Sequence, residues 1–330
     1  MAKSPYRKWL LLGFKAIVTG TLIWIILENV NLSETRDHLA QASFAMVAAV
    51  LALVAIQSLV ASARWLMLMR LFGPALPYRT AVRLYFEGLF FNQALPSTVG
   101  GDAVRMYRAI KLGLPLSAGI NGVLLDRIVG LLGLLLVVLA TQPLLYQRID
   151  DPATRIAFAV LLALGGLAAI ALYSIASVPD RYRRWAIVRG VTQLSGAFRT
   201  MVHRPAIGAS VLAVSILGHV IIVSAIYAIV QGLDVEVGFA DCLMLVPAVM
   251  LFATIPISIA GWGVREGAMV AAFALVGASE SGAVAVSFLF GLTMIVIGLP
   301  GGLLWYKNPD HRVVDMGDLE QMAEEGAGNP

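Results

Sequence analysis

Two arginines stand in long apolar stretches of the sequence, each shortly after small residues that interrupt the hydrophobic pattern. They are Arg105 and Arg265. A charge within a thick apolar layer costs roughly 2.5 to 3.5 kcal/mol, so each arginine should face the protein interior and have a partner. The glycines that precede them are Gly100, Gly101, Gly261 and Gly263. If helices begin at these glycines, the guanidinium groups and the free N–H groups of the first helical turns suit a phosphate.

Acidic residues beside the two arginines allow a second interpretation. Asp102 precedes Arg105 by three residues, and Glu266 follows Arg265 directly. Each arginine could pair with its acidic neighbour and serve only to seal the chain at this point. Alternatively, the carboxylates could belong to the same binding site as the arginines. The residue types leave both interpretations open.

A further pair of charges, Asp126 and Arg127, lies in the apolar stretch at residues 117–141. Adjacent residues of a helix point about 100 degrees apart, so these two side chains are not expected to pair with each other. One of them could complete a network with Arg105 or Glu266. Both could instead lie near the end of a span and extend their charged groups to its surface.

Glu87 and Asn92 precede the first run of small residues and could line the same cavity. A carboxylate there could also relay protons. Histidines, cysteine and carboxylates do not occur with metal-ligand spacing, and neither a G-x-x-x-x-G-K-[ST] loop nor a G-x-S-x-G motif is present. The sequence therefore predicts no catalytic residue, no metal, no cofactor and no nucleic-acid partner.

The composition is that of a membrane protein. Of the 330 residues, 59% are hydrophobic and only 13% are charged, whereas soluble domains usually have about 25% charged residues. A helix needs about 20 apolar residues to cross a membrane, and runs of that length recur along the chain. The predicted fold is an all-α polytopic membrane protein. Six full spans are predicted, at residues 10–28, 44–69, 117–141, 155–178, 205–231 and 280–305.

Two further apolar regions, at residues 80–110 and 241–277, are each interrupted near the middle by proline and glycine. Pro96 and Pro256 mark the breaks. Non-helical backbone at membrane depth is tolerated only where it lines a cavity or is buried in protein. Each region is expected to form either a re-entrant hairpin of two half-helices or two short spans.

The two interrupted regions align without a gap at a separation of 160 residues, so that LPSTVGGDAVR matches IPISIAGWGVR. The same offset matches the flanking spans, which predicts repeat units at about residues 44–146 and 204–306 within a single transmembrane domain, residues 1–306. The charge pattern predicts opposite orientations for the two units. Inverted repeats with broken segments are typical of transporters that bind their substrate between the repeats.

Positive charges in short loops indicate the cytoplasmic side of a membrane. Lys3, Arg7 and Lys8 predict a cytoplasmic N-terminus. The arginine-rich residues 181–204 are predicted on the same side, whereas residues 232–241 contain neither Lys nor Arg. Six crossings also place the C-terminus in the cytoplasm.

Two polar segments lie outside the predicted spans. Residues 181–200 combine arginines with apolar residues at roughly helical spacing, which fits either an amphipathic helix at the membrane surface or a plain cytoplasmic loop. Residues 307–330 are polar and acidic and are predicted to form a disordered tail.

Three segments resemble the lysylphosphatidylglycerol synthase transmembrane, flippase-like family. They are FNQALPSTVGGDAVRMYRAIKLG at residues 91–113, NGVLLDRIVGLLGL at residues 121–134 and IPISIAGWGVREGAMVAAFALVG at residues 255–277. The resemblance covers most of residues 10–306. This family includes the N-terminal membrane domain of bacterial multiple peptide resistance factors, which is thought to flip aminoacylated phosphatidylglycerol. Other members stand alone and are linked to other lipid or lipid-linked glycan pathways.

The resemblance implies functional positions in and around both breaks. The implied residues are Pro96, Gly100, Gly101, Asp102, Arg105, Asp126, Arg127, Gly263, Arg265 and Glu266. The chain ends soon after the last predicted span, so the aminoacyl-transferase domain of the fused family members, and with it synthase activity, is not expected.

These patterns predict a lipid translocase of a bacterial-type inner membrane, acting on a phospholipid, an aminoacyl-phospholipid or a polyprenyl-phosphate-linked lipid through a central polar cavity. One alternative is a membrane-embedded lipid transferase with Asp102 or Glu266 as its base. Another is a non-catalytic membrane partner of a separate lipid- or glycan-modifying enzyme. The sequence does not specify the lipid, the energy source or the oligomeric state.

Overall fold

The computed structural model describes residues 5–73, 76–95, 100–177, 186–255 and 257–307. These residues contain no strand, so the all-α prediction is confirmed. Pro96, Pro256 and the predicted tail beyond Lys307 lie outside the described residues. The thirteen helices of the described residues are α1 (Pro5–Asn29), α2 (Leu32–Ala40), α3 (Phe44–Met69), α4 (Tyr78–Ala94), α5 (Gly100–Lys111), α6 (Leu116–Ala140), α7 (Gln142–Arg148), α8 (Pro152–Ile175), α9 (Ala186–His203), α10 (Pro205–Gly232), α11 (Phe239–Ala253), α12 (Val264–Ala274) and α13 (Glu280–Tyr306).

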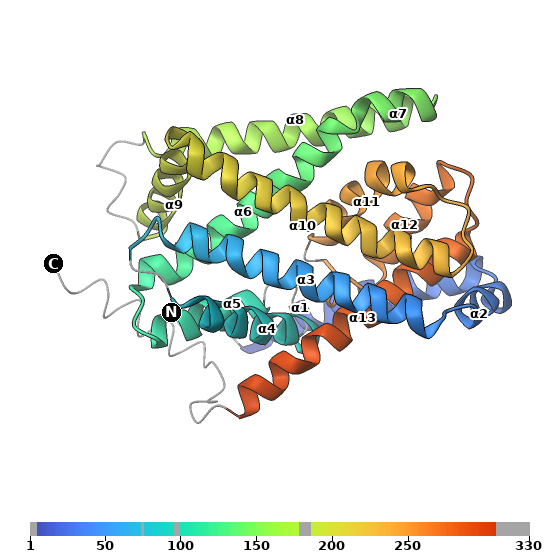
Figure 1. Ribbon diagram of the computed structural model, residues 1–330, viewed down its shortest axis with the longest axis horizontal. Coiled ribbons are helices and arrows are strands. Elements are labelled where there is room, and N and C mark those ends of the chain that lie inside the picture. The colour runs from blue at the N-terminus through green and yellow to red at the C-terminus, as the bar shows by residue number, and fades with distance from the viewer. Residues whose placement is uncertain (1–4, 74–75, 96–99, 178–185, 256, 308–330) are drawn as a thin grey trace.

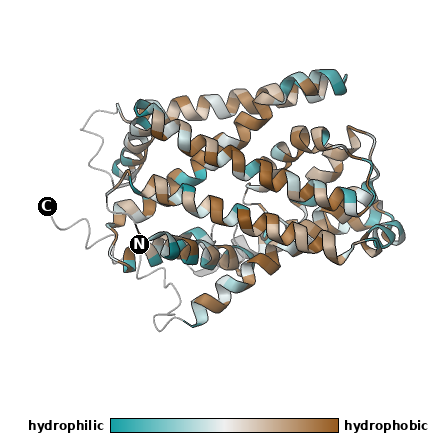
Figure 2. Cartoon of the chain, viewed as in Figure 1, coloured by the Kyte–Doolittle hydropathy of each residue, from teal (hydrophilic) through white to brown (hydrophobic). Residues whose placement is uncertain are grey.

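The predicted spans coincide with long helices. Among the described residues, α3, α6, α8, α10 and α13 are each long and apolar enough to cross a membrane. A sixth span results if α1 and α2, which meet at an angle of 90°, are counted as one bent unit. Figure 2 shows that hydrophobic residues dominate the long helices, while polar residues gather near the ends of the molecule. The prediction of a multi-pass membrane protein is thus confirmed.

Each interrupted region forms two helices that pack against each other, α4 with α5 and α11 with α12. In the first pair the two backbones are in close contact. A Cβ added to Gly101 would lie only 1.8 Å from the carbonyl oxygen of Gly88. In the second break, Gly261 and Gly263 have φ angles of 81° and 84°, a left-handed conformation that glycine adopts without steric cost. Both alternatives, a re-entrant hairpin and two short spans, contain two packed helices, and the choice between them stays a prediction.

Close helix packing holds the first hairpin in place. α13 packs along α4, and a Cβ added to Gly301 would lie only 1.9 Å from the carbonyl oxygen of Phe86. Between membrane helices, small residues of this kind allow the close backbone contact that replaces the hydrophobic effect as the source of association. The position of α4, and of the polar residues on it, is therefore fixed by backbone contact with its neighbours.

The order of a long helix, two shorter helices and a long helix occurs twice, as α3 to α6 and as α10 to α13. Corresponding helices begin 161 to 164 residues apart, close to the offset of the predicted repeat. α3 and α10 pack side by side and run in opposite directions (Figure 1). This course is compatible with two units of opposite orientation, and the inverted relation between the complete units stays a prediction.

α8 and α9 lie at the outer edge of the molecule (Figure 1). No residue of α8 is buried, whereas α9 buries Leu194, Phe198 and Met201 in a cluster with residues of α3, α6 and α10. Residues 186–200 are therefore helical, and the location of this helix at a membrane surface stays a prediction.

Candidate functional site

A chain of buried ion pairs links α3, α5 and α6. Asp126 of α6 lies at its centre: one carboxylate oxygen accepts a hydrogen bond from Nε of Arg64 at 2.9 Å, and the other accepts one from Nη2 of Arg105 at 3.2 Å. All three side chains are buried. Of the interpretations that the sequence allowed for Asp126, a network with Arg105 is the one that the structure contains.

Asp102 extends this chain of charges at the start of α5. Its two oxygens accept hydrogen bonds from Nη2 of Arg105, at 3.3 Å, and from Nε of Arg127. Arg127 of α6 is the more accessible end, with 35% of its side chain exposed. Asp126 and Arg127 are neighbours in sequence, yet they contact different partners, as their expected 100-degree separation on a helix requires.

Arg105 sits in an aromatic enclosure. Its guanidinium carbon lies 4.7 Å from the ring centre of Trp65 and 5.2 Å from that of Tyr85. The side chain is 4% exposed, and its Nε is buried without a hydrogen-bond partner. Cation–π contacts of this kind stabilise a desolvated cation by about 2 kcal/mol. The enclosure therefore holds the arginine at depth but leaves one of its donors unused.

Arg64 connects this network to the second half of the molecule. Its Nη1 donates to the hydroxyl of Ser215 on α10 at 2.9 Å, and that hydroxyl donates to the carbonyl oxygen of Val129 on α6 at 3.1 Å. Three helices from both halves thus meet at one guanidinium group.

A second buried carboxylate, Glu87 of α4, is also shared by two arginines. Arg83 donates from Nε at 3.0 Å, and Arg108 donates from Nε at 3.1 Å. Glu87 is fully buried, while the side chain of Arg83 is 38% exposed. Glu87 thus pairs with one arginine on its own helix and one on α5, and the second pair links the two helices.

The first backbone N–H groups near both breaks already have partners from the chain. The N–H of Gly101 donates to the side-chain oxygen of Asn92 at 2.9 Å, and the N–H of Gly263 donates to Glu266 at 2.6 Å. Side-chain caps normally satisfy these groups. The donors that the structure leaves for an anion are therefore arginine side chains rather than these two amides.

The second hairpin contains a smaller charge cluster. Nη2 of Arg265 donates to Glu266 at 2.6 Å, and its Nε donates to the hydroxyl of Ser287 on α13 at 3.1 Å. Ser287 in turn donates to the same oxygen of Glu266 at 3.1 Å. The guanidinium group also stacks on Trp262, 5.0 Å from the ring centre. One cation and one carboxylate balance each other in this cluster.

The two halves therefore differ in charge balance. In the contacts around Asp126, three guanidinium groups share two carboxylates, whereas Arg265 and Glu266 form a closed pair. No ion pair or hydrogen bond between described residues joins Arg105 to Arg265. The predicted pairings of each arginine with its acidic neighbour both occur, and the additional partners of Arg105 set the first cluster apart.

The members of the first cluster that sequence reasoning missed include Arg64, Trp65 and Ser215. Arg64 carried a usable signal, because a single cation well inside a predicted span must have a buried partner. Trp65 and Ser215 carried none, since aromatic and small polar residues are common in membrane helices.

The match to a known family covers all of these elements. The family model of the lysylphosphatidylglycerol synthase TM region matches residues 11–302. The chain belongs to this family. A comparison with curated proteins gave no match. Membership in the lysylphosphatidylglycerol synthase TM region family, together with the apolar helices, identifies a multi-pass membrane protein with a role related to membrane lipids.

Proposed function

We propose that this protein is a lipid translocase and that its first hairpin binds the phosphate of a lipid head group. The single observation that carries the proposal is Arg105. This arginine is buried among apolar helices, its two carboxylate partners are each shared with another arginine, and its Nε has no partner. A buried cation with incompletely satisfied donors attracts an anion.

A head group would meet this network at its more exposed end. Arg127 is 35% exposed, whereas Arg105 is 4% exposed, and Asp102 lies between the two. A phosphate could replace Asp102 as the partner of Arg127. Asp102 would then be the carboxylate that separates this phosphate from Arg105. Exchange of partners along such a chain moves an anion inward without leaving any arginine uncompensated. The phospholipid, aminoacyl-phospholipid and polyprenyl-phosphate lipids of the sequence prediction share this phosphate.

Replacing Arg105 with Gln should slow translocation by about tenfold or more, because one charge-assisted interaction contributes about 1.5 to 3 kcal/mol. The substitution leaves no carboxylate without a partner, since Asp126 keeps Arg64 and Asp102 keeps Arg127. Purified protein in liposomes with fluorescent phospholipid or polyprenyl-phosphate analogues would report translocation as the fraction of label that dithionite bleaches over time.

Lys111→Gln is the matched control, because it removes one positive charge from the exposed end of the same helix, α5. It should translocate at the wild-type rate. Equal rates for wild-type liposomes and empty liposomes with every lipid class would contradict the translocase proposal. Extraction of a covalently altered lipid, detected by mass spectrometry, would instead favour a transferase that uses Asp102 or Glu266.

The proposed orientation places both termini in the cytoplasm of a bacterial-type cell, with the protein in the inner membrane. The C-terminal ends of α10 and α13 lie at opposite ends of the molecule (Figure 1), which supports different sides for the segments that follow them. Reporter domains fused after Asp234 and after Pro330 should therefore give signals from opposite sides of the membrane. Signals from the same side would contradict both this orientation and the inverted repeat.

A further inference from the structure

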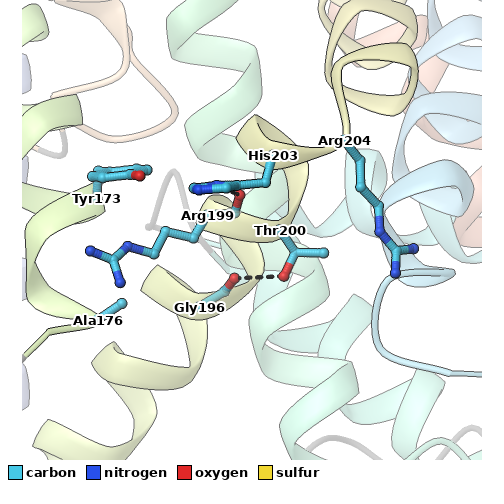
Figure 3. Close-up of a pocket in the computed structure, with 7 residues that line it drawn as sticks. All are labelled: Tyr173, Ala176, Gly196, Arg199, Thr200, His203 and Arg204. Carbon is cyan, nitrogen blue, oxygen red and sulfur yellow. Dashed lines mark hydrogen bonds between the residues drawn. The ribbon is translucent and has the colours of Figure 1, made fainter.

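A second basic site lies far along the chain from the network around Arg105, where α8 ends against α9. A pocket of about 660 Å³ opens there, within the roughly 300 to 1,000 Å³ range of small-molecule sites. Figure 3 shows its lining, which comes from the end of α8, the second half of α9 and the residues that directly follow each helix. The lining residues are Tyr173, Ala176, Gly196, Arg199, Thr200, His203 and Arg204.

Arg199 is held in place at this pocket without a counter-ion. Its guanidinium carbon lies 4.7 Å from the ring centre of Tyr173, and its Nη2 donates to the hydroxyl of Ser177 at 2.7 Å. Its Nε is buried and has no hydrogen-bond partner. No carboxylate of the described residues forms an ion pair with Arg199. An oriented guanidinium group without an anion is the arrangement that recognises phosphate.

His203 adds a second nitrogen donor or acceptor beside this arginine. Its ring stacks on Tyr173 with centres 6.0 Å apart, and its Nδ1 lies 3.0 Å from the carbonyl oxygen of Arg199. A carbonyl oxygen only accepts, so Nδ1 carries the proton and donates, which leaves Nε2 for other contacts. Thr200 donates its hydroxyl to Gly196 at 2.9 Å (Figure 3). The donor for an anion is therefore the guanidinium group of Arg199, because Nε2 of a ring that is protonated only at Nδ1 is an acceptor.

The helix that leads to the pocket has the surface of a lipid-facing span. No residue of α8 is buried, and five of its large apolar side chains are between 49% and 64% exposed. These side chains are Ile156, Val160, Leu164, Leu167 and Ile170. In a membrane such a surface is covered by hydrocarbon chains. A lipid beside α8 would have its head group at the level of a helix end, where the pocket lies.

We propose that this pocket binds the phosphate of an anionic membrane phospholipid whose acyl chains lie along α8, with the guanidinium group of Arg199 as its donor. The inference goes beyond the translocase proposal and does not depend on it, because the pocket residues share no contact with the network around Arg105. Binding here would anchor the outer helix pair α8 and α9 to the surrounding lipid.

The test is native mass spectrometry of the full chain in detergent with added phosphatidylglycerol, phosphatidylcholine or inorganic phosphate. Wild-type protein should retain phosphatidylglycerol in preference to phosphatidylcholine. Arg199→Gln should weaken the affinity for phosphatidylglycerol by about tenfold or more. Arg189→Gln, which removes an exposed charge from α9 outside the pocket, should leave this affinity within about twofold of wild type.

Three results would overturn the proposal. Wild-type affinity in Arg199→Gln would exclude the pocket, and an equal loss in Arg189→Gln would indicate a general charge effect. Displacement of the lipid by inorganic phosphate at a similar concentration would assign the site to free phosphate. Should Arg199→Gln elute as aggregate in gel filtration, Arg199→Lys serves in its place with the same expected direction, because lysine lacks the forked donors of arginine. Loss of translocation in Arg105→Gln with intact lipid retention would separate this site from the translocation site.

Discussion

Asp126→Leu should be among the most destabilising single substitutions in this protein. It removes the carboxylate that Arg64 and Arg105 share and leaves two buried guanidinium groups, one with only Ser215 and the other with only Asp102. Breaking a buried ion pair by removing one partner costs about 3 to 5 kcal/mol. The free energy of unfolding, measured by titration of detergent-solubilised protein with sodium dodecyl sulfate, should fall by that amount.

Asp150→Asn is the matched control for this experiment. Asp150 pairs with Arg155 at 3.1 Å but is fully exposed, so water compensates its loss and the unfolding midpoint should not move. Arg105→Gln should destabilise less than Asp126→Leu, because each carboxylate keeps an arginine. A loss below about 1 kcal/mol for Asp126→Leu would mean that the two arginines readily find other partners, contrary to a rigid network.

Gly101→Ala is expected to disrupt the first hairpin and, with it, translocation. The added Cβ would lie 1.8 Å from the carbonyl oxygen of Gly88 and 2.8 Å from the side chain of Asn92. Inserting a methyl group into a packed site typically costs about 1 to 3 kcal/mol, and the cost is highest where backbone cannot move aside. The separation of α4 from α5 would also weaken the Glu87 to Arg108 contact. Both the unfolding midpoint and the dithionite-measured rate should fall.

Gly166→Ala and Gly267→Ala test whether the effect comes from the contact. A Cβ at either helical glycine would meet no atom within 4 Å. Alanine favours a helix over glycine by about 0.5 to 1 kcal/mol, so these two variants should be as stable as wild type or slightly more stable. Wild-type stability and activity in Gly101→Ala would show that α4 and α5 are not in backbone contact.

Part of the candidate site was predictable because its members are local. Asp102 and Arg105 are three residues apart on one helix, so this pairing follows from spacing alone. Arg265 and Glu266 are adjacent, a spacing that does not by itself favour pairing, and both bond to Ser287 of α13. The role of Asn92 as the acceptor for the N–H of Gly101 was not predictable in the same way. It requires that α4 and α5 pack against each other, which the sequence does not specify.

Which arginine takes which carboxylate over a long sequence separation was beyond sequence reasoning. Arg64 and Asp126 are 62 residues apart, and nothing in either span indicates its partner. The different charge balance of the two halves was likewise beyond sequence reasoning. LPSTVGGDAVR and IPISIAGWGVR look alike, yet the first joins a five-membered network and the second forms a closed pair with Ser287 as a neighbour.

Arg105 and Arg265 occupy matching positions in the sequence but are therefore not equivalent in the folded protein. Sequence alone determined the membrane class, the positions of the long helices and the two breaks, because about 20 apolar residues span a membrane whatever surrounds them and because proline and glycine interrupt a helix locally. Only tertiary structure decided that Arg105 shares Asp126 with Arg64, that Arg265 is already neutralised, and that α8 and α9 enclose a basic pocket. Those outcomes depend on which helices pack together, and backbone contacts such as that between Gly88 and Gly101 set this packing.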